Sequence, residues 1–359
     1  MEKITINAST HSYNVEIGAS IRFQLEGLMN KTYKKVLIIT DHQVAPLYLE
    51  DVKQAFSSQT EVFEHIVPAG EASKSMEQYS SLLDTCITNK LDRKSLIVGL
   101  GGGMVGDLAG FAASTYLRGV DFLQMPTTIL AHDSSVGGKV AINHSQGKNL
   151  IGCFYNPVQV IYDTETLLSL PPSEIRSGFG EVVKHALLSD PAWCTELLES
   201  EISAMNNEKL NLYLSKGIQV KADIVEKDEK EQGIRQHLNL GHTLAHALEA
   251  ELGYGQITHG EAVAIGIWFA LRVSEKQVDA ALPTRKYRDW LINNDYPVKL
   301  AAEIDSDKII SRMKWDKKTV ESQLHYVLLK SVGQPLVKSV EEDELKGYLT
   351  DFIKEVSQH

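Results

Sequence analysis

Apolar residues follow two different patterns along this chain, and the change falls near residue 170. Before it, short apolar runs alternate with helical periodicity, and the runs predict buried strands. These strands are expected at Val36–Thr40, Val62–Val67, Leu96–Leu100, Phe122–Met125 and Val158–Tyr162. Helices between them, notably Ser75–Asn89 and Met104–Thr115, favour a mostly parallel sheet covered on both faces. Lys3–Asn7 and Ser12–Ile17 are expected to add an antiparallel hairpin at its edge.

Beyond Pro171 and Pro172, long helical patterns replace the strands until His325–Leu329. The helices are expected at Glu174–Leu188, Pro191–Met205, Glu208–Glu226, Gly241–Glu251 and His259–Val278. We therefore expect an α/β domain over residues 1–170 and a mainly α-helical domain over residues 171–359. The charged run Glu226–Glu231 is interpreted as a solvated helix end.

Composition narrows the function classes. A length of 359 residues suits two domains, and a net charge of −11 argues against a general nucleic-acid-binding surface. Cys86, Cys153 and Cys194 form no CxxC pair, which disfavours a disulfide framework and a cysteine-based zinc site. The N-terminal residues lack an apolar signal core, and no apolar run reaches the roughly 20 residues of a membrane helix. The expectation is a cytoplasmic protein without a membrane anchor.

A glycine-rich segment, GLGGGMVGD, follows a predicted strand and opens a predicted helix. Gly101, Gly103 and Gly106 fit the spacing G-x-G-x-x-G, in which the backbone approaches a dinucleotide pyrophosphate. A tight turn needed only for packing is the alternative. The acidic residue about 20 positions further on is Asp121, but Asp41, at the end of the first predicted parallel strand, is better placed to meet a ribose.

Two lysines, Lys139 and Lys148, lie in the Gly-, Ser- and Asn-rich segment Ser134–Asn149, which is interpreted as a loop. In an acidic protein, such lysines favour a pocket for phosphate or carboxylate, although two solvated lysines would give the same pattern. Arg118, in the turn-like YLRGVD, is either a further anion-binding group or a surface arginine.

Histidines cluster between residues 235 and 266. His242 and His246 are spaced i, i+4 and share a helix face, and His259 precedes a long apolar helical pattern. Neutral imidazole is the commonest transition-metal ligand, so this segment is predicted to form one wall of a metal site. A core position for His246 and a surface position for His237 are the alternatives. The HExxH motif is absent, because no Glu follows His242.

A carboxylate lies on another predicted helix, within GEVVKHALL, where Glu181, Lys184 and His185 share roughly one face. Glu181 is either a metal ligand with a lysine beside it or half of a surface i, i+3 ion pair. His185 is either a ligand or a capping or core histidine.

Together these segments resemble the 3-dehydroquinate synthase family. The motifs GLGGGMVGDLAGF, RGVDFLQMPTT, DSSVGGKVAINHSQGKNLIG, GEVVKHALL, RQHLNLGHTLAHALEA, HGEAVAIG and WDKK occur in the family's order, over about residues 36–330. The resemblance implies a homodimer whose subunit has a Rossmann-like NAD-binding α/β domain and an α-helical metal-binding domain, with the active site in the cleft between them.

The resemblance also assigns site residues. It implies a divalent metal, zinc or cobalt, on Glu181, His242 and His259, which is the ligand set of an open catalytic site. NAD-binding positions map onto Asp41, Gly70, Glu71, Lys74, Gly103, Met104, Val105, Gly106, Asp107, Thr127, Thr128, Lys139, Lys148, Thr166, Leu167, Leu168 and Ser169. Substrate positions map onto Asp133, Lys139, Asn149, Lys184, Lys221, Arg235, Asn239 and His246, with one of Lys317 and Lys318. Arg118 is expected to reach the site of the partner subunit.

The chain departs from the usual family pattern at a few positions. Only His132 separates Ala131 from Asp133, where two residues are usual, so His132 is expected to face the site. Ala245 replaces a frequent Gly, Gly180 a frequent Ala, and Ser169 a frequent Thr. None of these changes removes a ligand or a charged group.

The activity implied is that of a carbon–oxygen lyase in the shikimate pathway of aromatic amino acid biosynthesis. Such an enzyme converts DAHP (3-deoxy-D-arabino-heptulosonate 7-phosphate) into 3-dehydroquinate and phosphate. Transient oxidation by NAD, β-elimination of phosphate, re-reduction and an intramolecular aldol closure complete the cycle. The alternatives are another sugar phosphate cyclase, of the 2-deoxy-scyllo-inosose or valiolone type, a metal-dependent polyol dehydrogenase, and a non-catalytic NAD-sensing protein.

Overall fold

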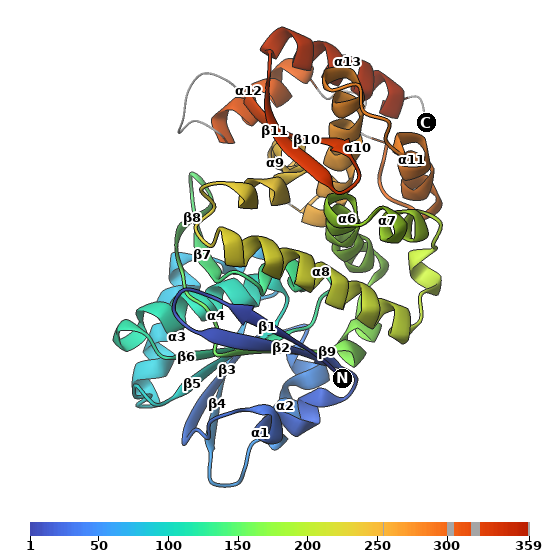
Figure 1. The fold of residues 1–359 in the computed structure, drawn as a ribbon. Coiled ribbons are helices and arrows are strands. Elements are labelled where there is room, and N and C mark those ends of the chain that lie inside the picture. The colour runs from blue at the N-terminus through green and yellow to red at the C-terminus, as the bar shows by residue number, and fades with distance from the viewer. Residues whose placement is uncertain (254, 300–304, 317–323, 358–359) are drawn as a thin grey trace. The chain divides into compact units, whose positions relative to one another are not determined.

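The computed structural model describes residues 1–253, 255–299, 305–316 and 324–357. These residues form two compact units (Figure 1). The first comprises Met1–Leu170 and Asn207–Glu229, and the second comprises Pro171–Asn206 and Lys230–His359. The units differ from the two continuous segments expected from the sequence in one helix, α8 (Asn207–Lys227), which packs with the first unit.

A seven-stranded sheet lies at the centre of the first unit, in the order β1-β2-β9-β6-β5-β3-β4. Its strands are β1 (Glu2–Asn7), β2 (Ser12–Gly18), β3 (Lys35–Asp41), β4 (Glu61–Val67), β5 (Leu96–Gly101), β6 (Asp121–Pro126) and β9 (Gln159–Asp163). The pair β1 and β2 is antiparallel, and the other neighbouring pairs are parallel. The predicted strands and the edge hairpin are therefore confirmed.

Alternate residues of the central strands enter two separate cores. Leu37 and Ile39 of β3 pack in the core that contains residues of α3 (Met76–Thr88) and α4 (Gly103–Thr115). Val36 and Ile38 pack in the other core, which contains residues of α1 (Leu25–Leu28) and α2 (Glu50–Gln54). Because side chains along a strand alternate between faces, a continuous apolar strand supplies both cores. The prediction of a parallel sheet covered on both faces is confirmed.

The interpretation of Ser134–Asn149 as a loop is wrong. After the short helix α5 (Ala131–Ser134), the chain forms an antiparallel hairpin of β7 (Lys139–His144) and β8 (Gly147–Phe154). Val140 and Ile142 of β7 enter the core beneath α4. This alternation within KVAINH is a strand signal, but the surrounding Gly, Ser and Asn residues are typical of loops.

Helix α8 packs against β1, β2 and α5 in the first unit. Two carboxylates hold it there, Glu226 in the last turn of α8 and Glu229 just after the helix. Glu226 Oε1 accepts a hydrogen bond from the backbone N–H of Asn7 at 2.9 Å, and Glu229 Oε2 accepts one from Ser9 at 3.0 Å. The interpretation of Glu226–Glu231 as a solvated helix end is confirmed for Glu226, which is exposed in the last turn of α8, and the two hydrogen bonds are an addition that the sequence did not indicate.

The second unit is mainly helical, as predicted. Its helices are α6 (Pro172–Ser189), α7 (Pro191–Leu198), α9 (His242–Leu252), α10 (His259–Gln277), α11 (Thr284–Asn293), α12 (Ser306–Asp316) and α13 (Glu342–Ser357), and β10 (Leu324–Ser331) and β11 (Gln334–Val340) form a hairpin. The helix predicted over Pro191–Met205 is wrong beyond Leu198, where only a short 3-10 turn, Ile202–Ala204, follows. Helices α11, α12 and α13 and strand β11 were not predicted.

Helix α10 is the central element of this unit. It contacts α6, α9, α11 and α13, and its residues from Gly260 to Leu271 are all buried. A helix that is apolar on every side is surrounded by other elements rather than lying on a surface. Its first residue is His259, so the packing of the whole unit fixes that histidine. Within the described residues, no helix has the length and apolar character required to cross a membrane.

Candidate active site

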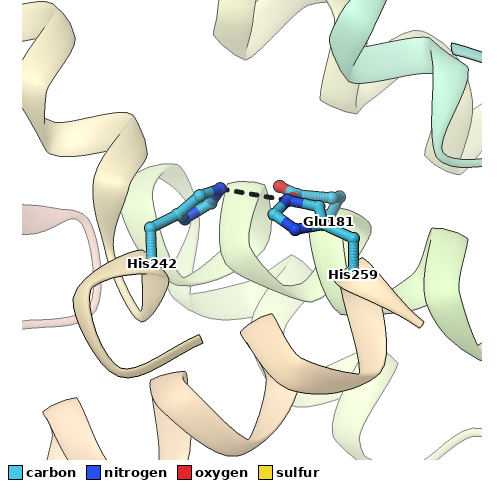
Figure 2. A group of neighbouring side chains, drawn as sticks. All are labelled: Glu181, His242 and His259. Carbon is cyan, nitrogen blue, oxygen red and sulfur yellow. Dashed lines mark ion pairs between the residues drawn. The ribbon is translucent and has the colours of Figure 1, made fainter. Parts of the chain in front are cut away.

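Three side chains from separate helices of the second unit point toward one another (Figure 2). Glu181 of α6 is 2% exposed, and its Oε1 lies 3.4 Å from His242 Nε2 and 3.8 Å from His259 Nε2. Ligands at the roughly 2.0–2.1 Å of a tetrahedral zinc site lie about 3.3 Å apart. One carboxylate and two imidazoles at these separations fit a zinc or cobalt ion.

The protonation state of His242 suits metal binding. Burial lowers the pKa of His242 from 6.5 to about 4, although the nearby Glu181 carboxylate opposes this shift. The imidazole is therefore neutral at pH 7, as a ligand must be. Its Nδ1 lies 3.3 Å from the carbonyl oxygen of Leu240. An Nδ1–H directed there leaves the Nε2 lone pair on the side of Glu181.

Glycines set the separation between the helices that carry Glu181 and His259. A Cβ added at Gly180 would lie 2.1 Å from the carbonyl oxygen of Gly260, and one added at Gly260 would lie 1.7 Å from that of Ser177. Helices α6 and α10 therefore meet backbone to backbone, one residue from each of the two side chains.

The start of α9 is held in the same way. Gly241, with φ +83°, precedes His242, and a Cβ added at Gly266 of α10 would lie 2.0 Å from the Gly241 carbonyl oxygen. A capping box of Thr258 and Glu261 fixes the first turn of α10. These contacts between helices bring the three side chains together. No spacing of residues along the sequence indicates that they are close.

Other predicted residues lie beside this cluster. The ring of His246 is centred 5.6 Å from that of His242 and 5.9 Å from that of His259. The ammonium group of Lys184 forms an ion pair with Glu181 Oε2, and both side chains are almost fully buried. Arg235 is 1% exposed. Asn239 donates a hydrogen bond of 3.0 Å to Glu231 Oε1.

The two remaining histidines of the candidate segments, His185 and His237, differ in burial. His185, on α6, is fully buried. His237 is partly buried, which lowers its pKa. Lys317 and Lys318 lie outside the described residues.

In the first unit, a buried lysine links predicted NAD-binding and substrate-binding positions. Lys74 is 4% exposed, and its Nζ donates to Asp107 Oδ2 at 2.6 Å and to Asn149 Oδ1. Asn143 completes the network, because its Oδ1 accepts from the Asn149 backbone N–H and its Nδ2 donates to Glu71 Oε1. Burial raises the pKa of Asp107, and the Lys74 ammonium opposes that rise.

A second ion pair in this unit joins α5 and α8. Lys221 is 6% exposed, and its Nζ lies 2.9 Å from Asp133 Oδ2. It also donates to the backbone carbonyl of Asp133. His132, just before, is fully buried, with its Nδ1 2.6 Å from the carbonyl oxygen of Ile129. That carbonyl can only accept, so Nδ1 carries the proton in this contact.

The glycine-rich turn lies where the sequence placed it. Strand β5 ends at Gly101 and α4 begins at Gly103, beside a small pocket. Packing also contributes to the need for glycine, because a Cβ at Gly101 would lie 2.6 Å from a Val105 methyl carbon. The main-chain N–H of Thr127, after β6, donates to the Gly101 carbonyl oxygen.

The two acidic candidates for binding a ribose lie at opposite ends of parallel strands, one at a carboxyl end and the other at an amino end. Asp41 ends β3, and Asp121 begins the parallel strand β6. Ligands of open α/β sheets bind at the carboxyl ends of the strands, which favours Asp41. Asp41 Oδ1 accepts from the backbone N–H groups of Gln43 at 2.8 Å and Val44 at 3.0 Å, so it also holds the following turn.

The remaining predicted positions lie on turns, strands and a 3-10 helix of the first unit. Gly70, with φ +104°, opens a 3-10 turn. Ser169 accepts a hydrogen bond of 2.8 Å from the Tyr48 hydroxyl, in the 3-10 helix Thr164–Ser169. Lys139 is exposed at the start of β7, and Lys148 lies on β8. Arg118 has φ +68° and follows Leu117 with φ +51°, an uncommon pair of left-handed residues.

Sequence reasoning missed Glu249, a buried carboxylate on α9 whose Oε2 lies 3.0 Å from His259 Nδ1. It lies three residues after His246 and seven after His242, on the same helix face. This spacing was the available signal.

This chain is similar to known proteins along its whole length. The family model described as 3-dehydroquinate synthase N-terminal matches residues 64–177, and the C-terminal model matches residues 178–319. A 3-dehydroquinate synthase of Oceanobacillus iheyensis is 48% identical over 358 residues, covering 100% of both chains.

Solved structures with the same fold include two sugar phosphate cyclases. A 2-deoxy-scyllo-inosose synthase in complex with carbaglucose-6-phosphate, NAD+ and Co2+ has a TM-score of 0.87 at 26% identity, covering 98% of this chain and 99% of its own. The 2-epi-5-epi-valiolone synthase of Streptomyces hygroscopicus subsp. jinggangensis, with NAD+ and Zn2+, has a TM-score of 0.85 at 22% identity, covering 96% and 97%.

Proposed function

Because this chain belongs to the 3-dehydroquinate synthase family, we propose that it converts DAHP into 3-dehydroquinate and phosphate. It would act as a carbon–oxygen lyase in the shikimate pathway, in the cytoplasm. The structural observation that carries the proposal is the cluster of Glu181, His242 and His259. An enzyme of this kind needs one acidified alcohol and one reversible hydride acceptor, and the cluster is the chain's means of providing the first.

NAD and one divalent metal ion, zinc or cobalt, are the proposed cofactors. Bound metal would supply a Lewis acid at the alcohol that is oxidised, and bound NAD would accept and return a hydride. Glu181, His242 and His259 would hold the metal. The residues that would hold NAD are Asp41, the Gly70–Lys74 turn, the first turn of α4, Thr127 and Thr128, Lys139, Lys148 and Thr166–Ser169.

Cationic side chains of the chain would bind the carboxylate and the phosphate of the substrate. We assign this role to Lys139, Lys184, Lys221 and Arg235, because charge-assisted hydrogen bonds to anions are about twice as strong as neutral ones. Asn149 and Asn239 would orient the hydroxyl groups. Asp133 would hold the Lys221 ammonium in place, as the 2.9 Å contact between them suggests.

Proton transfer is assigned to His246, whose ring adjoins those of His242 and His259. The departing phosphate can itself accept the proton that is lost in the elimination. His246→Ala should therefore reduce turnover while metal content stays normal. Full turnover in that variant would exclude proton transfer by His246.

The proposed assembly is a homodimer in which Arg118 of each subunit completes the site of the other. Its left-handed backbone, next to a Leu117 that is 40% exposed, fits a segment shaped for a neighbour. Mixing Arg118→Ala with a variant inactive through Glu181→Gln tests this, because hybrid dimers would contain one intact site.

Phosphate release from DAHP, with catalytic NAD and added zinc or cobalt, tests the proposed function. We expect release of one phosphate per 3-dehydroquinate, no net NADH, and loss of activity on chelation. Glu181→Gln should abolish the reaction. Glu251→Gln, which alters a partly buried carboxylate of α9 that pairs with Arg312, is the matched control. A protein that binds metal but releases no phosphate would refute the proposal. Net NADH formation from a simple polyol would indicate a dehydrogenase instead.

A further inference from the structure

A buried carboxylate outside the assigned ligand set lies against the metal cluster. Glu249 is 5% exposed and sits on the inner face of α9. A carboxylate taken out of water is costly unless it is paired and hydrogen-bonded. Its Oε2 lies 3.0 Å from His259 Nδ1, which supplies that partner.

The two nitrogens of His259 have different neighbours. Nδ1 lies against Glu249, and Nε2 lies 3.8 Å from Glu181 Oε1. An ionised carboxylate only accepts hydrogen bonds, so Glu249 selects the tautomer with the proton on Nδ1. The Nε2 lone pair is then free of its proton on the side of the proposed metal.

The separation favours a hydrogen bond between Glu249 and His259 over shared ligation. His246, Glu249 and His259 lie close enough to be considered as an alternative ligand group. Two ligands of a tetrahedral ion with bonds of about 2.0–2.1 Å lie about 3.3 Å apart. The 3.0 Å between Glu249 and His259 is a hydrogen-bond distance, whereas the 3.4 Å between Glu181 and His242 matches a pair of ligands.

We propose that Glu249 is a positioning residue of the metal site, which orients His259 and fixes its tautomer through the Nδ1 hydrogen bond. This inference rests on the proposed function. With His259 and the metal, Glu249 would form a carboxylate–histidine–metal triad, an arrangement in which the outer carboxylate raises the basicity of the imidazole.

The test measures Co2+ affinity by competition with a chelator, together with the cobalt absorption spectrum. Glu249→Ala should weaken binding by about 10–100-fold. Glu249→Gln should lose less, about threefold to tenfold, because the amide oxygen still accepts from Nδ1–H. Its spectrum should stay that of the wild type, since no ligand is lost. Glu251 lies two residues after Glu249 on the same helix, and its carboxylate pairs with Arg312. Glu251→Gln should therefore bind Co2+ as the wild type does.

Two results would overturn the proposal. Wild-type affinity in Glu249→Ala would show that the hydrogen bond does not contribute. Equal losses in both variants, with a changed cobalt spectrum, would show that Glu249 is itself a ligand. Thermal melting of the metal-free variants reports folding, and if Glu249→Ala does not fold, the near-isosteric Glu249→Gln decides alone. Phosphate release by the wild-type protein is measured separately, so failure of the proposed function remains distinguishable from failure of the positioning role of Glu249.

Discussion

Gly180→Ala should weaken both the second unit and its affinity for metal, because the new methyl group meets backbone. The added Cβ would lie 2.1 Å from the carbonyl oxygen, 2.8 Å from the carbonyl carbon and 3.2 Å from the Cα of Gly260. Helices α6 and α10 would have to separate locally by about 1 Å to restore ordinary contact. Overpacking of this severity costs about 3 kcal/mol, and alanine regains about 1 kcal/mol of helix propensity.

The expected net loss is therefore about 2 kcal/mol in the free energy of unfolding of the metal-free protein, measured by urea denaturation. Because Glu181 and His259 adjoin the contact, Co2+ affinity should fall at least about tenfold, or about 1.4 kcal/mol. Gly347→Ala is the matched control: it lies on α13 with no atom within 4 Å of the added Cβ, so it should stabilise slightly. If Gly180→Ala matched the wild type in stability and cobalt affinity, the reasoning from this contact would be refuted.

Three further predictions concern other parts of the molecule. Lys74→Met should lower the free energy of unfolding by up to about 3 kcal/mol, because Asp107 loses the cation that it contacts; unchanged urea midpoints would contradict this. The metal-free protein should lose stability as the pH falls from 6.5 to about 4, because unfolded histidine is protonated there while His242 in the fold stays neutral. The loss should reach at most about 3 kcal/mol, and His242→Asn should flatten the dependence of the urea midpoint on pH. Glu229→Ala should cost about 1–2 kcal/mol and speed limited proteolysis near the end of α8, because the backbone N–H of Ser9 loses its acceptor; cleavage at the wild-type rate would show that this contact does not hold the helix.

Local pattern accounted for most of the fold. Strands such as Lys35–Asp41 are apolar on both faces, and that continuous run is hard to form in another way. The β7–β8 hairpin escaped prediction because its alternation is short and lies among residues typical of loops. Helix α11 could have been found, since Tyr287, Trp290 and Leu291 are buried at the i, i+3, i+4 spacing of a helix.

The site was less accessible to pattern. Spacing connected His242 with His246, although the structure places the carboxylate of Glu181 between His242 and His259. No local rule joins α6 to α10, because their approach depends on Gly180 and Gly260 meeting in the folded unit. Only the family resemblance named these three ligands together.

The network around Lys74 shows the same limit. Its partners come from α4 and β8, so charge pairing among them depends on tertiary contacts that residue spacing does not encode. Glu249 was predictable in part: its helix face follows from the sequence, but its hydrogen-bond partner depends on the fold.

The assignment of α8 to the first unit has a consequence for biosynthesis. A ribosome releases residues 171–206 of the second unit before it releases the helix that completes the first. A nascent chain ending at Leu170 therefore has the whole parallel sheet but lacks Lys221 and the helix that packs on β1 and β2. The order of synthesis and the order of completion differ, and a fragment cut at the apparent domain boundary would expose a surface that the intact chain covers.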